Sequence, residues 1–333
     1  METVWDGEVG LVLWSQALGG WLEPPMRAVT VLGGKTLLLP LLALLFWCVH
    51  AGTGARLSLV LLGSSLVNGL FKGVSHGPRP YWFTPAVTPL TTESTFGLPS
   101  GHAQTAVAVW GYLAARIRRR WAWPAAAALI ALIAFSRVYL GAHFVTDVVA
   151  GMAVGALLLW LVLRYEDSLL RWWRGRTPTH QVGLAFTVSL LPGVGVITWQ
   201  ELIRRDWRLP AEWTGAVPPD VANETLTYVS TLGGGFFGVL VGFSVLAARG
   251  WYSAEGPLVS RAARYVIGMA GTVLILVAVR TAVPTVDGAA GALREYAVYA
   301  LMSLWGALGA PELFLRMRLA VRPETVEGRQ FSA

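Results

Sequence analysis

The sequence predicts an all-α protein, a polytopic membrane helical bundle with about nine transmembrane helices. Of its 333 residues, 55% are hydrophobic and only 14% are charged, which is too apolar for an ordinary soluble domain. The apolar residues form runs of about 20, the length that crosses the hydrocarbon core of a bilayer. The basic residues cluster between those runs, so the net charge of +7 indicates membrane orientation and not nucleic-acid binding.

The apolar runs begin after an N-terminal segment, residues 1–30. This segment carries acidic residues and tryptophans and is broken by Gly19-Gly20, so we expect it to lie in the membrane interface. The predicted spans are 31–50, 57–75, 99–116, 124–139, 143–164, 181–201, 226–248, 263–283 and 292–313. Gly77 and four prolines predict a loop over 76–98, and a polar segment around 171–176 follows the fifth span.

The basic residues also predict the orientation of the chain. If the cluster Arg116–Arg120 is cytoplasmic, 16 of the 26 lysines and arginines fall on the cytoplasmic side. The N-terminus is then outside and the C-terminus is cytoplasmic. No basic stretch, apolar core and cleavage site open the chain, so we expect no cleaved signal. A single cysteine, Cys48, excludes an intramolecular disulfide and a zinc site built on cysteines.

Three polar clusters interrupt the apolar runs between Lys72 and Asp147. They are Lys72-x6-Arg79-Pro80, Pro99-Ser100-Gly101-His102 and Ser136-Arg137-x5-His143-x3-Asp147. A charge at bilayer depth costs several kcal/mol unless it is paired or faces a polar cavity, so such residues are functional candidates. The predicted topology brings all three clusters to the outer face of the membrane.

The cationic residues of these clusters predict a receptor for an oxyanion. The guanidinium groups of Arg79 and Arg137 match phosphate oxygens in bidentate fashion, and Lys72 adds a point charge. Only two of the 26 basic residues are lysines, which indicates that a slim cationic head is required at position 72. The helix that opens at Ser100 offers free N–H groups and a hydroxyl donor, and Gly101 lets the backbone approach an anion closely. Phosphate is the expected ligand.

Two histidines supply the remaining chemistry of phosphoryl transfer. His143 and Asp147 are four residues apart, which places the carboxylate on the same helix face as the imidazole, where it fixes the tautomer and stabilises the cation. We therefore expect His143 to be the nucleophile, through a phosphohistidine, and His102 to be the general acid.

The three clusters together resemble the signature of the type 2 phosphatidic acid phosphatase superfamily, which includes the vanadium haloperoxidases. The resemblance covers about residues 25–165. It implies metal-independent hydrolysis of a phosphomonoester or diphosphate at an extracytoplasmic site, with no cofactor. It also implies a phosphate site made of Lys72, Arg79, Ser100, Gly101 and Arg137, with His102 as acid and His143 as nucleophile.

We therefore expect four parts: an interfacial segment 1–30, a phosphatase core 31–165, additional transmembrane helices 166–320 and a cytoplasmic tail 321–333. The expected substrate is a lipid phosphate or a polyprenyl diphosphate, hydrolysed at the outer face of the plasma membrane. The outside N-terminus, the nine spans and Arg79-Pro80-Tyr81-Trp82 are also similar to the glucose-6-phosphatase branch. Hydrolysis of a soluble sugar phosphate and transfer to an acceptor other than water are thus alternatives.

A transporter or scramblase is disfavoured because the inner halves of spans three to five contain Ala, Val, Leu and Gly, which line no polar path. Outside the clusters, Lys35 is expected to snorkel at a helix end, and His76 has no place in the pattern. Asn68 is expected to bond either the site or a neighbouring helix. Glu93, in the loop above the pocket, is a candidate contact of Arg79 or Arg137. The sequence does not specify the oligomeric state.

Overall fold

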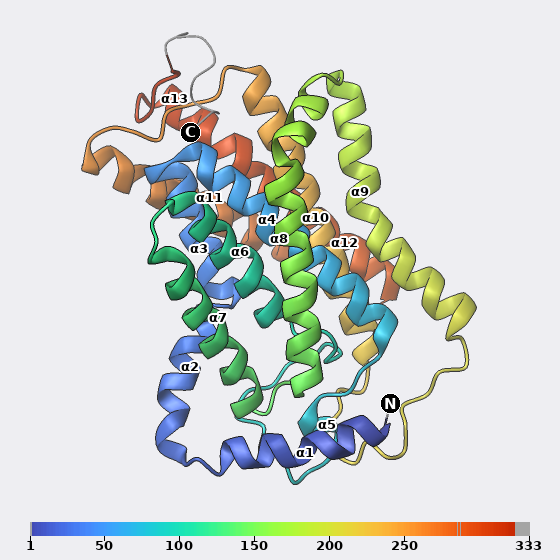
Figure 1. Ribbon diagram of the computed structural model, residues 1–333. Helices are drawn as coiled ribbons and strands as arrows, with labels where there is room; N and C mark the ends of the chain where they lie inside the picture. The colour runs from blue at the N-terminus through green and yellow to red at the C-terminus, as the bar shows by residue number, and fades with distance from the viewer. Residues whose placement is uncertain (1, 285, 287, 324–333) are drawn as a thin grey trace. The chain divides into compact units, whose positions relative to one another are not determined.

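The computed structural model describes residues 2–284, 286 and 288–323, and this part of the chain is all-helical (Figure 1). The helices of the first half are α1 (Glu2–Gln16), α2 (Glu23–Val31), α3 (Lys35–Leu44), α4 (Ala51–Ser75), α5 (Pro80–Phe83), α6 (Gly101–Ile117), α7 (Ala122–Tyr139) and α8 (Val145–Arg174). Those of the second half are α9 (Pro178–Thr198), α10 (Val221–Ala248), α11 (Leu258–Ala282), α12 (Gly288–Leu304) and α13 (Ala310–Arg316). Short π-helical turns extend α3, α9 and α12.

The predicted membrane character agrees with these helices. Within the described residues, seven helices are long and apolar enough to cross a membrane, and the bent pair of α2 and α3 makes up to eight. The remaining predicted span corresponds to α6, which has 17 residues. About nine spans is therefore roughly consistent with the structure.

Two helix ends and one bend are notable differences from the predicted spans. The helix predicted from 57 begins at Ala51. Helix α8, the predicted fifth span, continues to Arg174, so the segment around 171–176 is largely helical. Its last turn contains Arg171 and Arg174, and arginines interact favourably with the C-terminal end of the helix dipole. The first span is bent by 43° at a break of three residues that includes Gly33-Gly34. From residue 324 on, the predicted tail lies outside the described residues.

The chain forms two compact units. The first comprises Met1–Leu38, Ser64–Glu166 and Pro192–Val229, and the second comprises Leu39–Gly63, Asp167–Leu191 and Ser230–Ala333. All three polar clusters belong to the first unit. That unit also contains residues 192–229, which the sequence assigned to the additional helices beyond the core.

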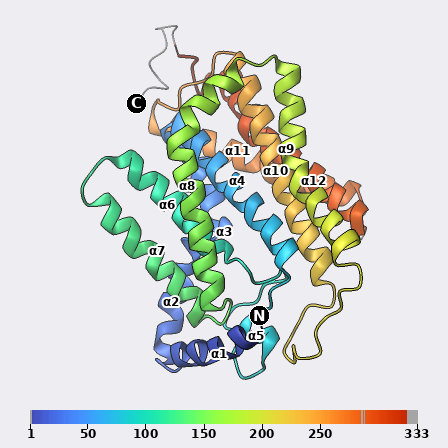
Figure 2. The ribbon, with the colours of Figure 1, turned by 45° about the vertical axis from the view of Figure 1, so that its right-hand side comes forward.

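In the first unit, α6 and α7 form a hairpin and lie side by side in both views (Figures 1 and 2). Glycines let α8 pack closely against α6: a Cβ added to Gly151 would lie 2.4 Å from the carbonyl oxygen of Ser100, and one added to Gly155 would lie 2.6 Å from that of Gln104. Such close packing of helix backbones is what glycines spaced four apart provide. It brings the start of α6 next to the start of α8, where the second and third clusters lie.

Helix α1 lies across the ends of α7 and α8 (Figure 1). The tryptophans of the N-terminal segment, which was expected to lie in the membrane interface, differ in their surroundings. Trp5 is buried in a core cluster with Val12 and stacks near Phe144, whereas Trp14 and Trp21 are exposed as an interfacial position requires. One face of α1 is therefore part of the core of the first unit.

The second unit is held by an aromatic core and by hydrogen bonds to backbone carbonyls. The hydroxyl of Tyr252 donates to the carbonyl of Phe46 (2.5 Å), and the indole of Trp47 donates to that of Gly306 (2.9 Å). These bonds satisfy carbonyls near π-helical turns, where the regular helical pairing changes.

Candidate active site

Helix α4 presents one polar face to a cavity in the first unit. Ser65, Asn68 and Lys72 follow one another at spacings of three and four, which places them on one side of the helix. All three side chains are buried. The ammonium group of Lys72 donates to the carbonyls of Phe96 and Gly97, the latter at 3.1 Å. The Lys72 side chain is thus fixed at the cavity by two carbonyls of the loop that precedes α6.

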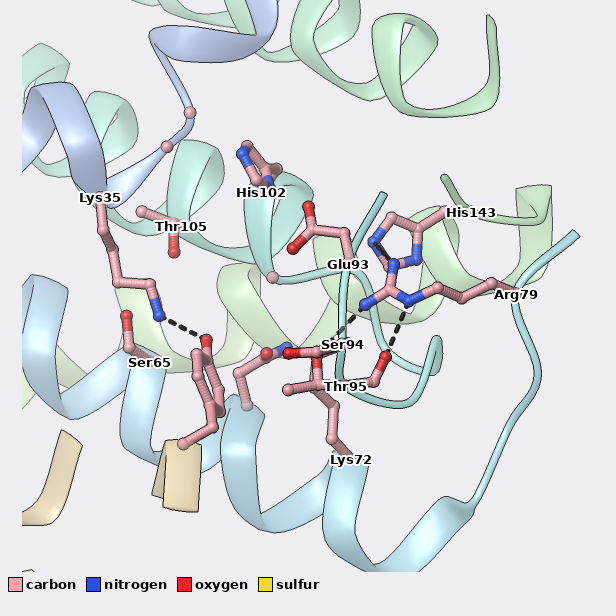
Figure 3. A pocket seen from close by; sticks show the side chains of 15 residues that line it. Lys35, Ser65, Lys72, Arg79, Glu93, Ser94, Thr95, His102, Thr105 and His143 are labelled. Carbon is pink, nitrogen blue, oxygen red and sulfur yellow. Dashed lines mark hydrogen bonds between the residues drawn. The ribbon is translucent and has the colours of Figure 1, made fainter. Parts of the chain in front are cut away.

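Arg79 is buried after the end of α4 and is held by the loop that precedes α6. Its Nε donates to the carbonyl of Thr95 (2.7 Å), and its other nitrogens donate to the carbonyls of Ala142 (3.0 Å) and Phe96 (3.2 Å). Its Nη1 also lies 3.3 Å from Nε2 of His143 (Figure 3). Within the described residues, neither this guanidinium nor Lys72 has a carboxylate partner at ion-pair distance.

The Ser-Gly-His turn opens α6 as the sequence predicts. Ser100 is the N-cap of the helix, and its hydroxyl accepts from the N–H of Ala103 (3.5 Å). The N–H of Ser100 donates to the carbonyl of Asp147 (2.9 Å), which ties this turn to α8. Gly101 and His102 line the cavity, and the hydroxyl of Ser100, which accepts in the cap, can still donate its own O–H. Ser100 therefore supports the turn that presents the next two residues.

The geometry around His143 defines its tautomer. Nδ1 donates to Oδ2 of Asp147 (3.2 Å), and the same oxygen accepts from the N–H of Phe144 (3.1 Å). Nε2 faces an N–H of Arg79, which can only donate, so Nε2 carries the lone pair. Burial, then the charges of Arg79 and Lys72, hold the pKa of His143 well below its usual value. This shift favours the neutral imidazole, in which the lone pair of Nε2 accepts the N–H of Arg79.

Arg137 is engaged by an acidic residue. Its Nη2 donates to Oε1 of Glu93 at 2.7 Å, and Nη1 donates to the hydroxyl of Thr30 at 2.9 Å. Glu93 is itself positioned by the hydroxyl of Tyr81, which accepts from its N–H and donates to its carbonyl. Burial alone would raise the pKa of Glu93, but Arg79 and Arg137 outweigh burial and lower it to about 2. A permanent carboxylate thus lies among the cations of the site.

The cavity has a volume of about 140 Å³ and is lined only by residues of the first unit. Of the predicted site residues, five line it: Lys72, Arg79, Gly101, His102 and His143. The other three, Ser100, Arg137 and Asp147, lie behind this first layer and contact its members or its neighbours. In the part of the chain that is described, no group of three or more His, Cys, Asp or Glu side chains is arranged to hold a metal ion.

Lys35 and Tyr228 are cavity residues that the sequence did not predict, and they contact each other. Lys35, expected at a helix end, lines the cavity beside the Gly33-Gly34 break, and Tyr228 reaches it from α10. The ammonium group of Lys35 donates to the hydroxyl of Tyr228 at 2.5 Å and lies 3.9 Å from the centre of its ring. The scarcity of lysine, which singled out Lys72, applies equally to Lys35 and was the available signal.

A segment of the second half of the chain, residues 204–220, covers the Arg79-Pro80-Tyr81-Trp82 turn. Trp213 packs against Trp82, with ring centres 6.4 Å apart, and the N–H of Gly215 donates to the carbonyl of Trp82 (2.9 Å). Trp207 stacks on His76, with ring centres 4.9 Å apart. This gives His76 a structural place in an aromatic cluster beside the site.

Comparison with known proteins decides the family. Residues 53–171 match the model of the PAP2 superfamily, and residues 230–322 match that of the PAP2 superfamily phosphatase transmembrane extension. The chain is 32% identical over 164 residues to phosphatidylglycerophosphatase B of Bacillus subtilis, covering 45% of this chain and 78% of that protein. The chain belongs to the PAP2 superfamily. It is an integral membrane protein and a phosphatase of the PAP2 type.

Other PAP2 relatives match over shorter shares of their length. Lipid phosphate phosphatase delta of Arabidopsis thaliana is 33% identical, over 38% of this chain and 34% of its own. Glucose-6-phosphatase 3 of Homo sapiens is 31% identical, over 43% of this chain and 48% of its own, so the chain spans half or less of these two relatives. The crystal structure of the transmembrane PAP2-type phosphatidylglycerolphosphate phosphatase from Bacillus subtilis matches with a TM-score of 0.45 and 28% identity, covering 50% of this chain and 88% of that one.

Proposed function

We propose that this PAP2 phosphatase hydrolyses a lipid phosphate or a polyprenyl diphosphate through a phosphohistidine at His143. One observation carries the proposal: His143 lines the cavity with its Nδ1–H held by Asp147, so the lone pair is on Nε2, the nitrogen that lies 3.3 Å from the guanidinium of Arg79. A neutral imidazole fixed in this tautomer is the form that attacks phosphorus.

The reaction proceeds in two balanced steps. In the first, the lone pair of Nε2 forms a bond to phosphorus, the bond from phosphorus to the leaving oxygen breaks, and His102, which enters the step as an imidazolium, gives one N–H proton to that oxygen and becomes neutral. In the second, a water oxygen attacks phosphorus, the phosphorus–nitrogen bond breaks, and His102 takes the proton of the water. Lys72 and Arg79 neutralise the charge on the phosphoryl oxygens in both steps.

Arg137 and the α6 turn complete the phosphate receptor in this proposal. The backbone N–H groups that follow Ser100 point from a helix N-terminus, where anions are favoured. Arg137 joins the receptor when its guanidinium exchanges Glu93 for a phosphate oxygen. Asp147 stays on Nδ1 throughout and stabilises the positive charge that forms on the imidazole.

The bilayer position of the site follows from the distribution of arginines. If the cluster Arg116–Arg120 is cytoplasmic, 16 of the 26 lysines and arginines lie on the cytoplasmic side. In this orientation the cavity opens at the extracytoplasmic face and the N-terminus is outside. We propose the plasma membrane as the location. The names of the relatives support phosphorylated lipids and polyprenyl compounds as substrates: they include a lipid A 4'-phosphatase from Porphyromonas gingivalis and a dolichyldiphosphatase from Saccharomyces cerevisiae.

A soluble sugar phosphate is the second candidate substrate, and the similarity to glucose-6-phosphatase 3 favours it. Transfer of the phosphoryl group to an acceptor other than water is a variant of the same second step. Both candidates use the same nucleophile, so they are distinguished by substrate and product and not by the site residues.

The test is a substrate panel with purified protein and chelator present. Phosphate release is measured from phosphatidate, phosphatidylglycerophosphate, farnesyl diphosphate and glucose-6-phosphate, with mass spectrometry of the products. The wild-type protein is expected to release phosphate from a lipid or polyprenyl substrate and to form an acid-labile phosphoenzyme. His143→Gln is expected to lose both, whereas His180→Gln, an exposed histidine, keeps both. Turnover retained by His143→Gln would refute the proposed nucleophile.

A further inference from the structure

The cavity has two polar ends. Arg79 and His143 lie at one end, and Lys35, Ser65 and Thr105 lie at the other (Figure 3). The phosphoryl group is assigned to the first end by the nucleophile. The second end carries its own cation and hydroxyl groups, which the hydrolysis of the phosphoryl group does not use.

Lys35 is the cation of this second end. Its ammonium group contacts the hydroxyl and ring of Tyr228, and within the described residues no carboxylate lies at ion-pair distance from it. A phenol hydroxyl can accept one hydrogen bond from an ammonium group that has three N–H donors. The positive charge of Lys35 is therefore not neutralised by its neighbours.

Two further polar atoms of the cavity wall lack partners. The hydroxyl of Ser65 is buried, with the residue 2% exposed, and has no hydrogen-bond partner in the described structure. The amide oxygen of Asn68, one turn along α4, is buried and also lacks one. Buried polar atoms without a partner cost free energy, and a ligand group at the cavity can complete them. The hydroxyl of Ser65 can donate to an anion, whereas the amide oxygen of Asn68 can only accept, so of these two atoms only the hydroxyl is assigned to a phosphate.

The second end lies on the leaving-group side of the proposed reaction. A Cβ added to Gly34 would lie 3.2 Å from Nε2 of His102, so the general acid faces the backbone that leads directly into Lys35. The leaving oxygen receives its proton from His102. A group attached to that oxygen is therefore directed toward Lys35 and Tyr228.

We propose that Lys35, with Tyr228 and Ser65, binds a second phosphate group that the substrate carries on its leaving group. The preferred substrates are then diphosphates, or monoesters whose alcohol bears a phosphodiester, and not esters of neutral alcohols. This inference rests on the proposed function, because it uses the leaving-group side that His102 and His143 define. A polyprenyl diphosphate and a glycerophospholipid monophosphate both supply this chemistry.

The experiment uses two substrate pairs, in each of which only one member carries a second phosphate on its leaving group. One pair is farnesyl diphosphate and farnesyl phosphate, and the other is phosphatidylglycerophosphate and phosphatidate. The ratio of kcat/KM within each pair is measured for the full-length wild-type protein, Lys35→Met, Lys35→Arg and Tyr228→Phe. The control is Arg27→Met, because Arg27 is an exposed cation paired with Glu23 outside the cavity.

Lys35→Met is expected to lower the ratio of one pair by about 10-fold to 100-fold, the range for a lost hydrogen bond to a charged group. Lys35→Arg is expected to recover at least half of the wild-type ratio on a logarithmic scale, and Arg27→Met to keep it. The pair that responds identifies the source of the second phosphate. Equal loss on both members of each pair, or no change in either ratio, would overturn the proposal. If wild-type protein hydrolyses none of the four substrates, the proposed function itself fails.

Discussion

The pairing of Glu93 with Arg137 leads to a quantitative prediction for phosphate binding. The structure places this carboxylate 2.7 Å from a guanidinium assigned to the substrate. A phosphate that engages Arg137 must therefore replace Glu93 as its partner. Replacing Glu93 with glutamine removes the competing charge and keeps an oxygen that can accept a hydrogen bond.

The magnitude follows from the pKa of Glu93. Its decrease from 4.5 to about 2 corresponds to roughly 3 kcal/mol of favourable interaction for the ionised form. Because 33% of the side chain is exposed, solvent screening reduces this to about 1.5 kcal/mol. Release of that interaction is expected to tighten binding of inorganic phosphate about tenfold in Glu93→Gln.

The assay is competitive inhibition of hydrolysis by inorganic phosphate and by vanadate. The inhibition constant of Glu93→Gln is compared with those of wild type and of Glu212→Gln, a change at an exposed acidic residue of the same unit. Thermal unfolding in detergent checks that the variants are folded. If Glu93 instead orients Arg137 toward phosphate, the variant binds phosphate more weakly, and that result would refute the competition.

Two further predictions concern the nucleophile. Asp147→Asn is expected to lower kcat on the order of 1,000-fold or more, because the amide no longer fixes the Nδ1–H tautomer or stabilises the imidazolium; a tenfold loss or less, from single-turnover rates, would contradict the assigned role. His143 is expected to remain neutral at pH 5.5 in the folded protein, measured by nitrogen NMR of labelled histidine and assigned by its loss in His143→Gln. Because folding lowers the pKa of His143, its imidazole takes up a proton at higher pH in the unfolded chain than in the folded protein. The free energy of unfolding is therefore expected to fall as pH decreases below about 6.5. A folded midpoint near 6.5 is incompatible with this picture.

The parts of the site that are local in sequence could be predicted from sequence. His143 and Asp147 were expected on one face of a helix; in the structure His143 lies two residues before α8 begins, and Asp147 in its first turn reaches back to it. Ser100 caps α6 because serine is a preferred N-cap residue. The long apolar runs likewise predicted the helices to within a few residues at most ends. These features depend on spacing along one element, which a sequence displays directly.

The parts that depend on tertiary packing were not predictable in the same way. Tyr228 meets Lys35 from 193 residues away, and no periodicity relates the two positions. Glu93 was a candidate contact of Arg79 or Arg137, and the structure pairs it with Arg137; the choice depends on the path of the loop over 76–98, which the sequence does not specify. Lys35 was expected to snorkel because the sequence places it near the end of an apolar run. The sequence does not show the bend at Gly33-Gly34, beside which Lys35 lines the cavity.

The cover formed by residues 204–220, together with Tyr228, has a consequence for how this protein has diversified. The match to the PAP2 superfamily model ends at residue 171, yet Tyr228, which lines the cavity, lies more than 50 residues later in the chain. A chimera that keeps residues 1–171 and takes the rest from a relative would retain the nucleophile but inherit a foreign wall beside the leaving group. Selection for a new substrate can therefore act on a stretch of gene in which no catalytic motif occurs.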